Sequence, residues 1–364
     1  MKIGILGTGQ LARMLSLSGT PLGLTINCLG DNNDCAADCV HTVSNIPLHK
    51  FDDLCDWAKQ QDVITFENEN IDITIVQKIA EHCPVYPPIK SIEIAQDRLQ
   101  EKTMLNNCGV ETAPFMAVHA FNALQQAVDF YGLPAIVKTR RFGYDGKGQF
   151  QLETDADIRT AWAELENAPG RLIYEGFIDF DYEVSLVGTV SRDGDIAFYP
   201  LSQNTHSKGI LIKSVAPHMN DTLTEQAQTA FRAVAQHLEY VGTLAIEFFV
   251  CGNSLIANEI APRVHNSGHW TIEGATTSQF ENHMRAVAGL PLGDTQSSPT
   301  VMLNCIGNMP DADKITAIKN AHYHAYNKSA RHGRKVGHVT ISQANTTPES
   351  LTIAQEIIDT ALDY

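Results

Sequence analysis

The sequence lacks several features that would place it in a membrane, outside the cell or on nucleic acid. None of its hydrophobic runs approaches the roughly 18–20 apolar residues that a membrane helix needs. Lysine and arginine number 26 against 42 aspartates and glutamates, a formal net charge of -16 that disfavours nucleic acid as a partner. The start, Met1-Lys2-Ile3-Gly4-Ile5, reads directly as a strand and predicts no signal peptide. We therefore expect a cytoplasmic protein without nucleic-acid or membrane partners.

The eight cysteines include no CxxC pair. Cys35 and Cys39 lie four residues apart, but no second pair of ligands follows them, so the spacing disfavours a zinc site. Reduced thiols of an intracellular protein are the better interpretation. At 364 residues the chain has room for two or three domains, each with a core of its own.

The predicted elements divide the chain into unlike parts. Residues 1–90 alternate apolar strands with helices, and this βαβ rhythm predicts a parallel sheet covered by helices. There we expect strands at 3–6, 24–29 and 62–66, and helices from residue 10 and over 72–83. The middle of the chain predicts an antiparallel α+β block, with helices at 95–107, 122–131 and 222–239 and strands at 134–138, 172–177, 183–190, 196–200, 244–250 and 255–260. Residues 298–364 are expected to form a small β-rich tail with a closing helix.

A glycine-rich turn follows the first predicted strand and opens a helix. Its pattern is Gly7-x-Gly9-x-x-Ala12, and Asp31 lies about twenty residues further on, as a dinucleotide-binding fingerprint requires. The same glycines suit another phosphate-bearing ligand, or simply a tight turn. Nothing later in the chain supplies a hydride-transfer site, so an NAD-dependent oxidoreductase is kept as the alternative from another class of enzyme.

A lysine and a second glycine-rich segment offer contacts for nucleotide phosphates. Lys138 ends an apolar strand, where an isolated lysine is usually a solvated edge residue. The segment Gly143–Gln149 has three glycines in six residues, and amides free of Cβ bulk can wrap a phosphate. A hairpin turn is the other interpretation. The nearby Arg140, Arg141 and Lys147 favour phosphate binding.

Two glutamates are predicted on the two arms of one hairpin. A three-residue loop would set Glu247 opposite Glu259, whereas a two-residue loop would set it opposite Asn258. Either arrangement brings oxygen ligands together among apolar neighbours, where an unpaired carboxylate is costly. We interpret the pair as a Mg²⁺ site, with a structural salt bridge as the alternative. The segment Ala261–Trp270 follows directly, and its guanidinium, imidazoles and amide suit a planar oxyanion near the γ-phosphate.

Together these segments resemble the ATP-grasp ligases, and in particular the family of 5-(carboxyamino)imidazole ribonucleotide synthases. The resemblance covers about residues 3–340. It rests on Gly7–Leu11, Phe66–Asn70, Gln96–Arg98, Val137–Lys138, Gly143–Gln149, Tyr174–Phe177, Glu183–Val187, Tyr199–Pro200, Asn258–His269 and Gly333–His338. The run Asn258–His269 is the most specific of these.

The resemblance implies three domains that combine α/β and α+β architecture. Residues 1–97 would form a Rossmann-like pre-ATP-grasp domain that helps to bind the ribonucleotide. Residues 98–297 would form the central ATP-grasp domain, with a lid subdomain at about 112–182. Residues 298–364 would form a small β-rich C-terminal domain. The family is usually dimeric, so a homodimer is expected.

The resemblance also implies roles for individual residues. ATP would be bound by Arg98, Lys138, Gly143, Tyr144, Asp145, Gly146, Lys147, Gly148, Gln149, Glu175, Gly176, Phe177, Ile178, Glu183, His206, Asn258 and Glu259, with the adenine hinge beginning at Glu175. Mg²⁺ or Mn²⁺ would be held by Glu247 and Glu259. The ribonucleotide would be surrounded by Gln10, Leu11, Tyr144, Asp145, Lys147, Arg334 and Lys335. The catalytic set would be Arg263, His265, Asn266, Asp145 and Lys335, of which the first three would hold bicarbonate.

The implied reaction belongs to de novo purine (IMP) biosynthesis. ATP would phosphorylate bicarbonate to carboxyphosphate, which would deliver its carboxyl group to the exocyclic amine of 5-aminoimidazole ribonucleotide. Either His265 or Asp145 would remove the amine proton. The chain departs from the family at Lys147, where arginine is usual, and at Asn327 and His332, which replace glycine and proline. A ligase that activates formate is the alternative within the class.

Overall fold

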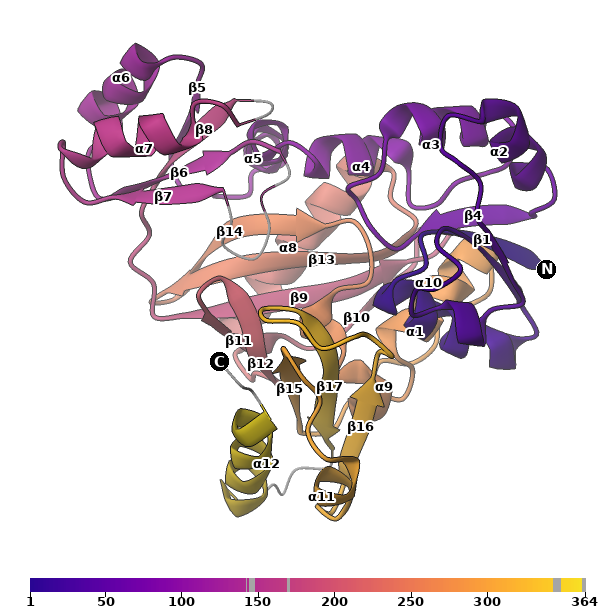
Figure 1. Ribbon diagram of the computed structural model, residues 1–364. Helices are drawn as coiled ribbons and strands as arrows, with labels where there is room; N and C mark the ends of the chain where they lie inside the picture. The colour runs from indigo at the N-terminus through magenta and orange to yellow at the C-terminus, as the bar shows by residue number, and fades with distance from the viewer. Residues whose placement is uncertain (142, 144–147, 169–170, 343–347, 362–364) are drawn as a thin grey trace.

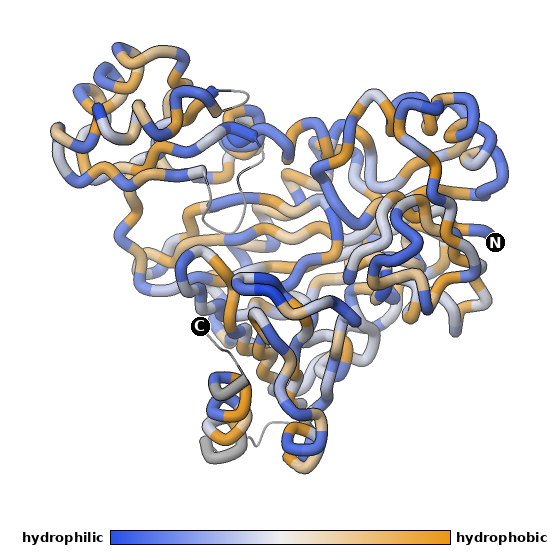
Figure 2. Tube along the Cα trace, in the orientation of Figure 1, coloured by the Kyte–Doolittle hydropathy of each residue, from blue (hydrophilic) through white to orange (hydrophobic). Residues whose placement is uncertain are grey.

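The computed structural model describes residues 1–141, 143, 148–168, 171–342 and 348–361. Figure 1 shows a central sheet with the N-terminal segment at upper right and a lid at upper left, and the C-terminal strands that extend the sheet lie below. Hydrophobic stretches run along the strands of the central sheet (Figure 2). Within the described residues, no helix combines the length and the apolar character needed to cross a membrane. All eight cysteines are described, and each is a free thiol.

The N-terminal segment forms the parallel sheet that its βαβ rhythm predicts. Its strand order is β3-β2-β1-β4, and every pairing is parallel. The strands are β1 (Lys2–Leu6), β2 (Thr25–Leu29), β3 (Thr42–Ser44) and β4 (Val63–Phe66). The helices and 3-10 turns are α1 (Gln10–Gly19), η1 (Thr20–Leu22), η2 (Ala37–Cys39), α2 (Phe51–Ala58) and α3 (Ile73–Ala80). Leu11, Met14 and Leu15 lie on the buried face of α1, as its helical period predicts.

The helix expected over 95–107 is present from Arg98 to Asn107, but its expected start is wrong, because the chain breaks at Gln96 and Asp97. Helix α4 (Ile89–Ala95) ends before Gln96, and α5 (Arg98–Asn107) begins after Asp97. Asp97 is extended, with φ -133°, and its carboxylate accepts from the Leu99 N–H at 3.1 Å. An aspartate that caps the first turn in this way starts a new helix.

A separate antiparallel sheet forms the lid. Its strand order is β5-β8-β6-β7. The strands are β5 (Phe115–Val118), β6 (Ala135–Thr139), β7 (Gln149–Leu152) and β8 (Leu172–Gly176). Helices α6 (Phe121–Tyr131) and α7 (Asp157–Leu165) pack on this sheet and share a core with it that includes Leu124, Val137 and Tyr174.

The central sheet has nine strands and joins the middle of the chain to its C-terminal part. The order is β14-β13-β9-β11-β12-β15-β17-β16, with β10 paired to β9. The strands are β9 (Tyr182–Val190), β10 (Ile196–Phe198), β11 (Ser202–Ser207), β12 (Ile210–Ala216), β13 (Gly242–Cys251), β14 (Ser254–Ala261), β15 (Thr300–Ile306), β16 (Ala321–Ala325) and β17 (Lys335–Ile341). Because β15 pairs with β12, the C-terminal strands extend this sheet. They still build a small core of their own with α11 (Ala312–Thr316) and α12 (Pro348–Ala361).

Helices of the middle segment tie the parts together. The long helix α8 (Asp221–Leu238) packs on the sheet through a core that includes Phe231 and Val234. The short turns η3 (Asn266–Gly268) and α9 (Thr271–Gly274) lead into α10 (Gln279–Ala288). Phe280 and Met284 of α10 enter the core of the N-terminal segment, so this helix fixes that segment against the central sheet.

Candidate active site

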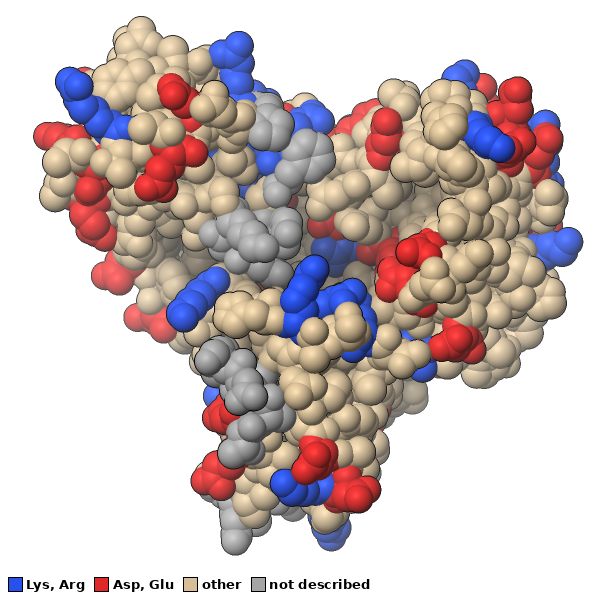
Figure 3. All heavy atoms as spheres, in the orientation of Figure 1, with Lys and Arg blue, Asp and Glu red and all other residues tan. Residues whose placement is uncertain are grey.

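One cavity of about 450 Å³ lies where the N-terminal segment, the lid and the central sheet meet. In Figure 3, lysine and arginine atoms gather in the hollowed middle of the molecule between these parts. Among the described residues, five cationic side chains line the cavity: Arg98, Lys138, Arg140, Arg263 and Lys335. Glutamates line it as well, so the cations could contact an anionic ligand within a mixed set of charges.

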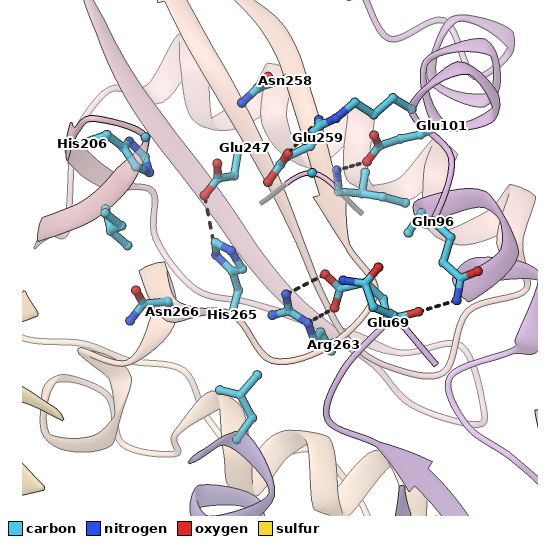
Figure 4. A pocket seen from close by; sticks show the side chains of 18 of the residues that line it. Glu69, Gln96, Glu101, His206, Glu247, Asn258, Glu259, Arg263, His265 and Asn266 are labelled. Carbon is cyan, nitrogen blue, oxygen red and sulfur yellow. Dashed lines mark hydrogen bonds and ion pairs between the residues drawn. The ribbon is translucent and has the colours of Figure 1, made fainter. Parts of the chain in front are cut away.

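The hairpin of β13 and β14 brings Glu247 opposite Glu259. The loop has only two residues, since Cys251 pairs with Ser254, and a two-residue loop alone would have placed Asn258 opposite Glu247. The register shifts between Glu247 and Phe248, so that Asn258 is an extra residue, a β-bulge. Both glutamates thus face the cavity from neighbouring strands (Figure 4).

Glu247 and Glu259 place two carboxylates close together in a partly buried position. Burial, with a smaller contribution from Glu259, raises the pKa of Glu247 to about 7. Within the described residues there is no group of three or more His, Cys, Asp or Glu side chains arranged to hold a metal ion. Mg²⁺ commonly takes one or two protein carboxylates and completes its shell with phosphate oxygens and water, so two carboxylates with an adjacent amide fit that ion.

Two lysines, the buried Lys102 and the partly exposed Lys138, meet at the carboxylate of Glu175. Lys138 Nζ of β6 lies 2.9 Å from Glu175 Oε2, and Lys102 Nζ of α5 lies 3.3 Å from the same oxygen. Burial opposes ionisation of this carboxyl, yet the two ammonium groups hold its pKa at about 2. The other oxygen, Oε1, is buried and has no hydrogen-bond partner within the described residues. Lys138 lines the cavity and is oriented by this contact.

A salt bridge between the N-terminal segment and the central domain orients Arg263. Its Nε and Nη2 both bond the carboxylate of Glu69, with Nη2 to Oε1 at 2.9 Å, while its Nη1 donates to the carbonyl of Val264. Gln96 holds the backbone around Glu69 by donating to its carbonyl and to that of Ile71, both at 2.6 Å. Figure 4 shows this guanidinium beside the His265 imidazole.

His265 is a neutral imidazole beside the candidate metal carboxylates. Its Nδ1 lies 3.7 Å from Glu247 Oε1 and accepts from the Ser267 N–H at 3.3 Å. Burial, followed by the charges of Arg263 and Lys335, lowers the pKa of His265 well below its usual value. A neutral imidazole in this position can accept a proton.

A network of side-chain hydrogen bonds fixes the amide of Asn266. The backbone carbonyl of Leu211 accepts from Asn304 Nδ2 at 2.8 Å, which settles the orientation of that amide. Asn304 Nδ2 then donates to Asn266 Oδ1 at 2.7 Å, and Asn266 Nδ2 donates to Asn304 Oδ1 at 3.0 Å. The second N–H of Asn266 points to His269 Nδ1 at 3.0 Å, and Tyr326 Oη lies 3.1 Å from the same nitrogen. Both N–H groups of Asn266 are therefore engaged within the protein.

The glycine-rich turn at the N-terminus is filled by a carboxylate of the chain itself, which argues against the dinucleotide alternative. The Gly9 N–H donates to Glu67 Oε1 at 2.5 Å, and the Ala12 N–H donates to Glu67 Oε2 at 2.9 Å. A Cβ atom on Gly7 would lie 2.5 Å from Glu67 Cγ. The chain's own carboxylate thus occupies the position that a pyrophosphate would take. Asp31, which would bind a ribose, instead accepts from the Asn33 N–H at 2.9 Å.

The structure brings most of the predicted site residues into this one cavity. Those that line it are Gln10, Leu11, Arg98, Lys138, Gly143, Gln149, Glu183, His206, Glu247, Asn258, Glu259, Arg263, His265, Asn266 and Lys335. Those outside the lining are Gly148, Glu175, Gly176, Phe177, Ile178 and Arg334. Tyr144, Asp145, Gly146 and Lys147 fall outside the described residues. His206 and Glu183 bond each other on neighbouring strands.

Sequence reasoning missed several residues that shape the cavity. Glu101 and Tyr326 line the cavity. Lys102 donates to the carbonyl of Asn258, and Asn304 bonds the amide of Asn266, both of which line the cavity. Glu101 is 2% exposed, and burial, with a smaller contribution from Glu259, raises its pKa to about 8. No local pattern marks these residues, because each acts on a partner far away in the sequence.

Comparison with known proteins defines the class first. Family models match an ATP-grasp domain over residues 103–280, a ribonucleotide synthetase preATP-grasp domain over 1–96 and a phosphoribosylaminoimidazole carboxylase C-terminal domain over 300–349. With the cavity described above, these matches define an ATP-grasp ligase that combines the predicted α/β and α+β parts.

Individual relatives define the family. The N5-carboxyaminoimidazole ribonucleotide synthase of Pseudomonas aeruginosa is 46% identical over 98% of both chains. The crystal structure of the synthetase from Thermus thermophilus has a TM-score of 0.93 and 42% identity, covering 100% of this chain and 99% of that one. The enzyme from Aspergillus clavatus, in complex with ADP and 5-aminoimidazole ribonucleotide, has a TM-score of 0.88 and 29% identity, covering 99% and 98%. The chain belongs to the N5-carboxyaminoimidazole ribonucleotide synthase family.

Proposed function

We propose that this cavity carboxylates 5-aminoimidazole ribonucleotide to 5-(carboxyamino)imidazole ribonucleotide, with ATP and bicarbonate, in purine biosynthesis. The observation that carries the proposal is the convergence in one cavity of Lys138 from the lid, the Glu247–Glu259 pair from the central sheet, and Arg263. A phosphate ligand, a metal pair and an oxyanion ligand in contact with one space are what phosphorylation of bicarbonate requires.

ATP would enter between the lid and the central sheet. Lys138 and Arg98 would contact its phosphates, and the backbone after Glu175 would bind adenine. Glu175 itself holds Lys138 at 2.9 Å, so its carboxylate orients the ammonium that faces the phosphates. Gly143–Gln149, Glu183 and His206 would complete the nucleotide site. Asn258 and Glu259 would face the phosphate end.

Glu247 and Glu259 would hold one or two Mg²⁺ ions, or Mn²⁺, together with the nucleotide phosphates. When bound, the metal supplies positive charge that neutralises the transferring phosphoryl group. The two carboxylates already lie opposite each other on neighbouring strands, so the chain does not need to rearrange to bring them together. Glu247 must be ionised to serve, which a metal ion beside it favours.

Bicarbonate would bind beside Arg263 and His265. Arg263 is held by Glu69, which fixes the plane of its guanidinium toward the cavity. A bicarbonate oxygen would attack the γ-phosphorus, ADP would leave, and carboxyphosphate would remain in the cavity. Because carboxyphosphate is labile in water, a lid that closes over it would protect it.

The ribonucleotide would bind on the N-terminal side of the cavity, near Gln10, Leu11 and Lys335, with Tyr144, Asp145, Lys147 and Arg334 as further contacts. Its exocyclic amine would attack the carboxyl carbon, phosphate would leave, and the amine proton would pass to a base. His265 is one candidate base, because it is neutral and lines the same cavity. Asp145 is the other. The protein is expected to be a cytoplasmic homodimer.

The test measures ADP release by the purified protein with MgATP, adding bicarbonate and 5-aminoimidazole ribonucleotide separately and together. We expect turnover that requires the ribonucleotide and rises with bicarbonate, and carboxylated product in equal amount to ADP. Replacing bicarbonate with formate should abolish turnover. ADP release that ignores the ribonucleotide but responds to another amine or acid would refute the substrate assignment. Light scattering of the same preparation measures the oligomeric state.

A further inference from the structure

Two consecutive residues of α5 hold the edge of the central sheet at the strand that supplies the second metal carboxylate. Strand β14 ends the strand order of that sheet, so its outer backbone groups face no strand of the sheet. Lys102 Nζ lies 3.3 Å from the carbonyl oxygen of Asn258, and Glu101 Oε1 accepts from the Ile260 N–H at 2.6 Å. Two side chains of α5 thus form hydrogen bonds with backbone groups of β14 that a neighbouring strand would otherwise bond.

These two contacts flank the position that decides the register of the hairpin. Asn258 is the bulged residue, and because of it Glu247 faces Glu259. A bulge leaves backbone groups without a ladder partner, so a bulge in a buried edge needs another source of hydrogen bonds. Lys102 supplies one to the carbonyl of the bulged residue, and Glu101 supplies the next to the N–H two residues on.

Both side chains are buried, so their contacts with β14 are made away from solvent. Glu101 is 2% exposed and Lys102 is 1% exposed. A buried ammonium without partners is strongly destabilising, and a buried carboxyl without a hydrogen-bond partner is costly, so both groups need the contacts that they make. Lys102 finds a second partner in Glu175 Oε2 at 3.3 Å. One ammonium therefore joins the bulge in the central sheet to the lid strand β8, whose Glu175 orients Lys138.

We propose that Glu101 and Lys102 are positioning residues that fix the bulge at Asn258 and thereby hold the two metal carboxylates opposite each other. The inference rests on the proposed function, because it takes Glu247 and Glu259 as the metal pair. Without the clamp of Glu101 and Lys102, the carbonyl of Asn258 loses its buried donor, and the strand relaxes toward the register that its two-residue loop favours. Metal binding is then weakened, while the remaining contacts keep the chain folded.

The experiment compares variants with and without each clamp contact. Lys102→Met keeps the length of the side chain and removes the ammonium, and Glu101→Leu removes the acceptor for the Ile260 N–H. Glu101→Gln keeps an acceptor oxygen and should rescue that contact. Lys78→Met is the matched control, because Lys78 forms an exposed ion pair with Glu81 on α3. Mn²⁺ binding in the presence of ADP is measured by electron paramagnetic resonance, and thermal unfolding is measured for every variant.

We expect Lys102→Met and Glu101→Leu to weaken Mn²⁺ binding by about 10–100-fold, as the loss of a ligand-supporting contact does. Glu101→Gln and Lys78→Met should remain within about twofold of the parent chain. If Lys102→Met lowers the melting temperature but leaves Mn²⁺ binding unchanged, the lysine is merely structural and the inference is wrong. If Lys102→Met does not fold, the comparison of Glu101→Leu with Glu101→Gln decides in the same way.

A variant of the metal pair separates this inference from the proposed function. Glu247→Gln should itself weaken Mn²⁺ binding, and adding Lys102→Met to it should cause little further loss, because both act through one site. If Glu247→Gln weakens Mn²⁺ binding and neither clamp substitution does, only the clamp is refuted. If Glu247→Gln binds Mn²⁺ as the parent chain does, the metal assignment fails, and the inference fails with it.

Discussion

The stability of the chain should fall with decreasing pH because of a histidine buried between two of its parts. His283 of α10 is fully buried. Its Nδ1 accepts from the backbone N–H of Thr243 in β13 at 3.1 Å, so the proton of the neutral ring lies on Nε2, which is 2.9 Å from Thr65 Oγ1 in β4. Protonation of Nδ1 would bring two donors face to face. Burial lowers the pKa of His283 from 6.5 to about 3.

The size of the effect follows from that shift in pKa. Below pH 6.5 the unfolded chain takes up a proton at this histidine, whereas the folded chain stays neutral until about pH 3. The contribution of His283 to stability is therefore fully present above pH 6.5 and is lost as the pH falls toward 3. The contribution of His283 to the free energy of unfolding should decrease by about 1.4 kcal/mol per pH unit in this window, and by about 5 kcal/mol over the whole of it.

The assay measures unfolding in urea from pH 7.5 down to pH 5 for the parent chain and for His283→Gln. Glutamine offers a donor and an acceptor but does not titrate. Below pH 6.5 the stability of His283→Gln should therefore fall less steeply than that of the parent chain, and the two slopes should differ by about 1.4 kcal/mol per pH unit. His237→Gln, at an exposed position on α8, is the control and should keep the parent slope. If His283→Gln and the parent chain lose stability in parallel, His283 is not the group that titrates and the reasoning is refuted.

Three further substitutions test the site. Lys138→Met removes the ammonium from the cavity, while Lys102 still neutralises Glu175, so the variant should fold like the parent chain. Its kcat/KM for ATP should fall by about 10²–10³. Unchanged bicarbonate-dependent ATP hydrolysis would contradict the phosphate role. Asn304→Ala removes two hydrogen bonds that fix Asn266, the neighbour of His265, so the KM for bicarbonate should rise about tenfold while the KM for ATP does not move. Equal changes in both would indicate general damage. Glu67→Ala leaves the N–H groups of Gly9 and Ala12 unpaired, which should lower the free energy of unfolding by about 1–3 kcal/mol. In the parent chain, where the carboxylate fills the turn, a calorimetric titration with NAD should show no binding.

Local pattern was sufficient for many of the elements, whereas the family resemblance supplied most of the predicted cavity residues. The strand periods predicted β1, β2 and β4, and the helical period predicted the buried face of α1, because burial of one face fixes these signals locally. The break between α4 and α5 was also readable, since Asp97 is a good N-cap residue, but an unbroken helical period concealed it.

What the pattern left open depends on partners far away in the sequence. Loop length alone did not decide which side chain faces Glu247, because the strand has a bulge at Asn258. The carbonyl of that residue accepts from Lys102, which lies 156 positions earlier in the sequence. The glycine-rich turn looks the same whether it surrounds a pyrophosphate or the carboxylate of Glu67, 58 residues from Gly9. Only the tertiary structure identifies the group that fills such a turn.

The charges around the cavity explain why a metal ion belongs to the proposed reaction. Its described lining has five cations and also five carboxylates, namely Glu69, Glu101, Glu183, Glu247 and Glu259. Several of them are paired with one another, Arg263 with Glu69 and Arg98 with Glu259. These pairs orient the cations but leave little net positive charge for a polyphosphate. A divalent cation between Glu247 and Glu259 would neutralise these two carboxylates and so favour binding of the nucleotide. Under the proposed function, the cavity would therefore bind ATP together with the metal and not ATP alone.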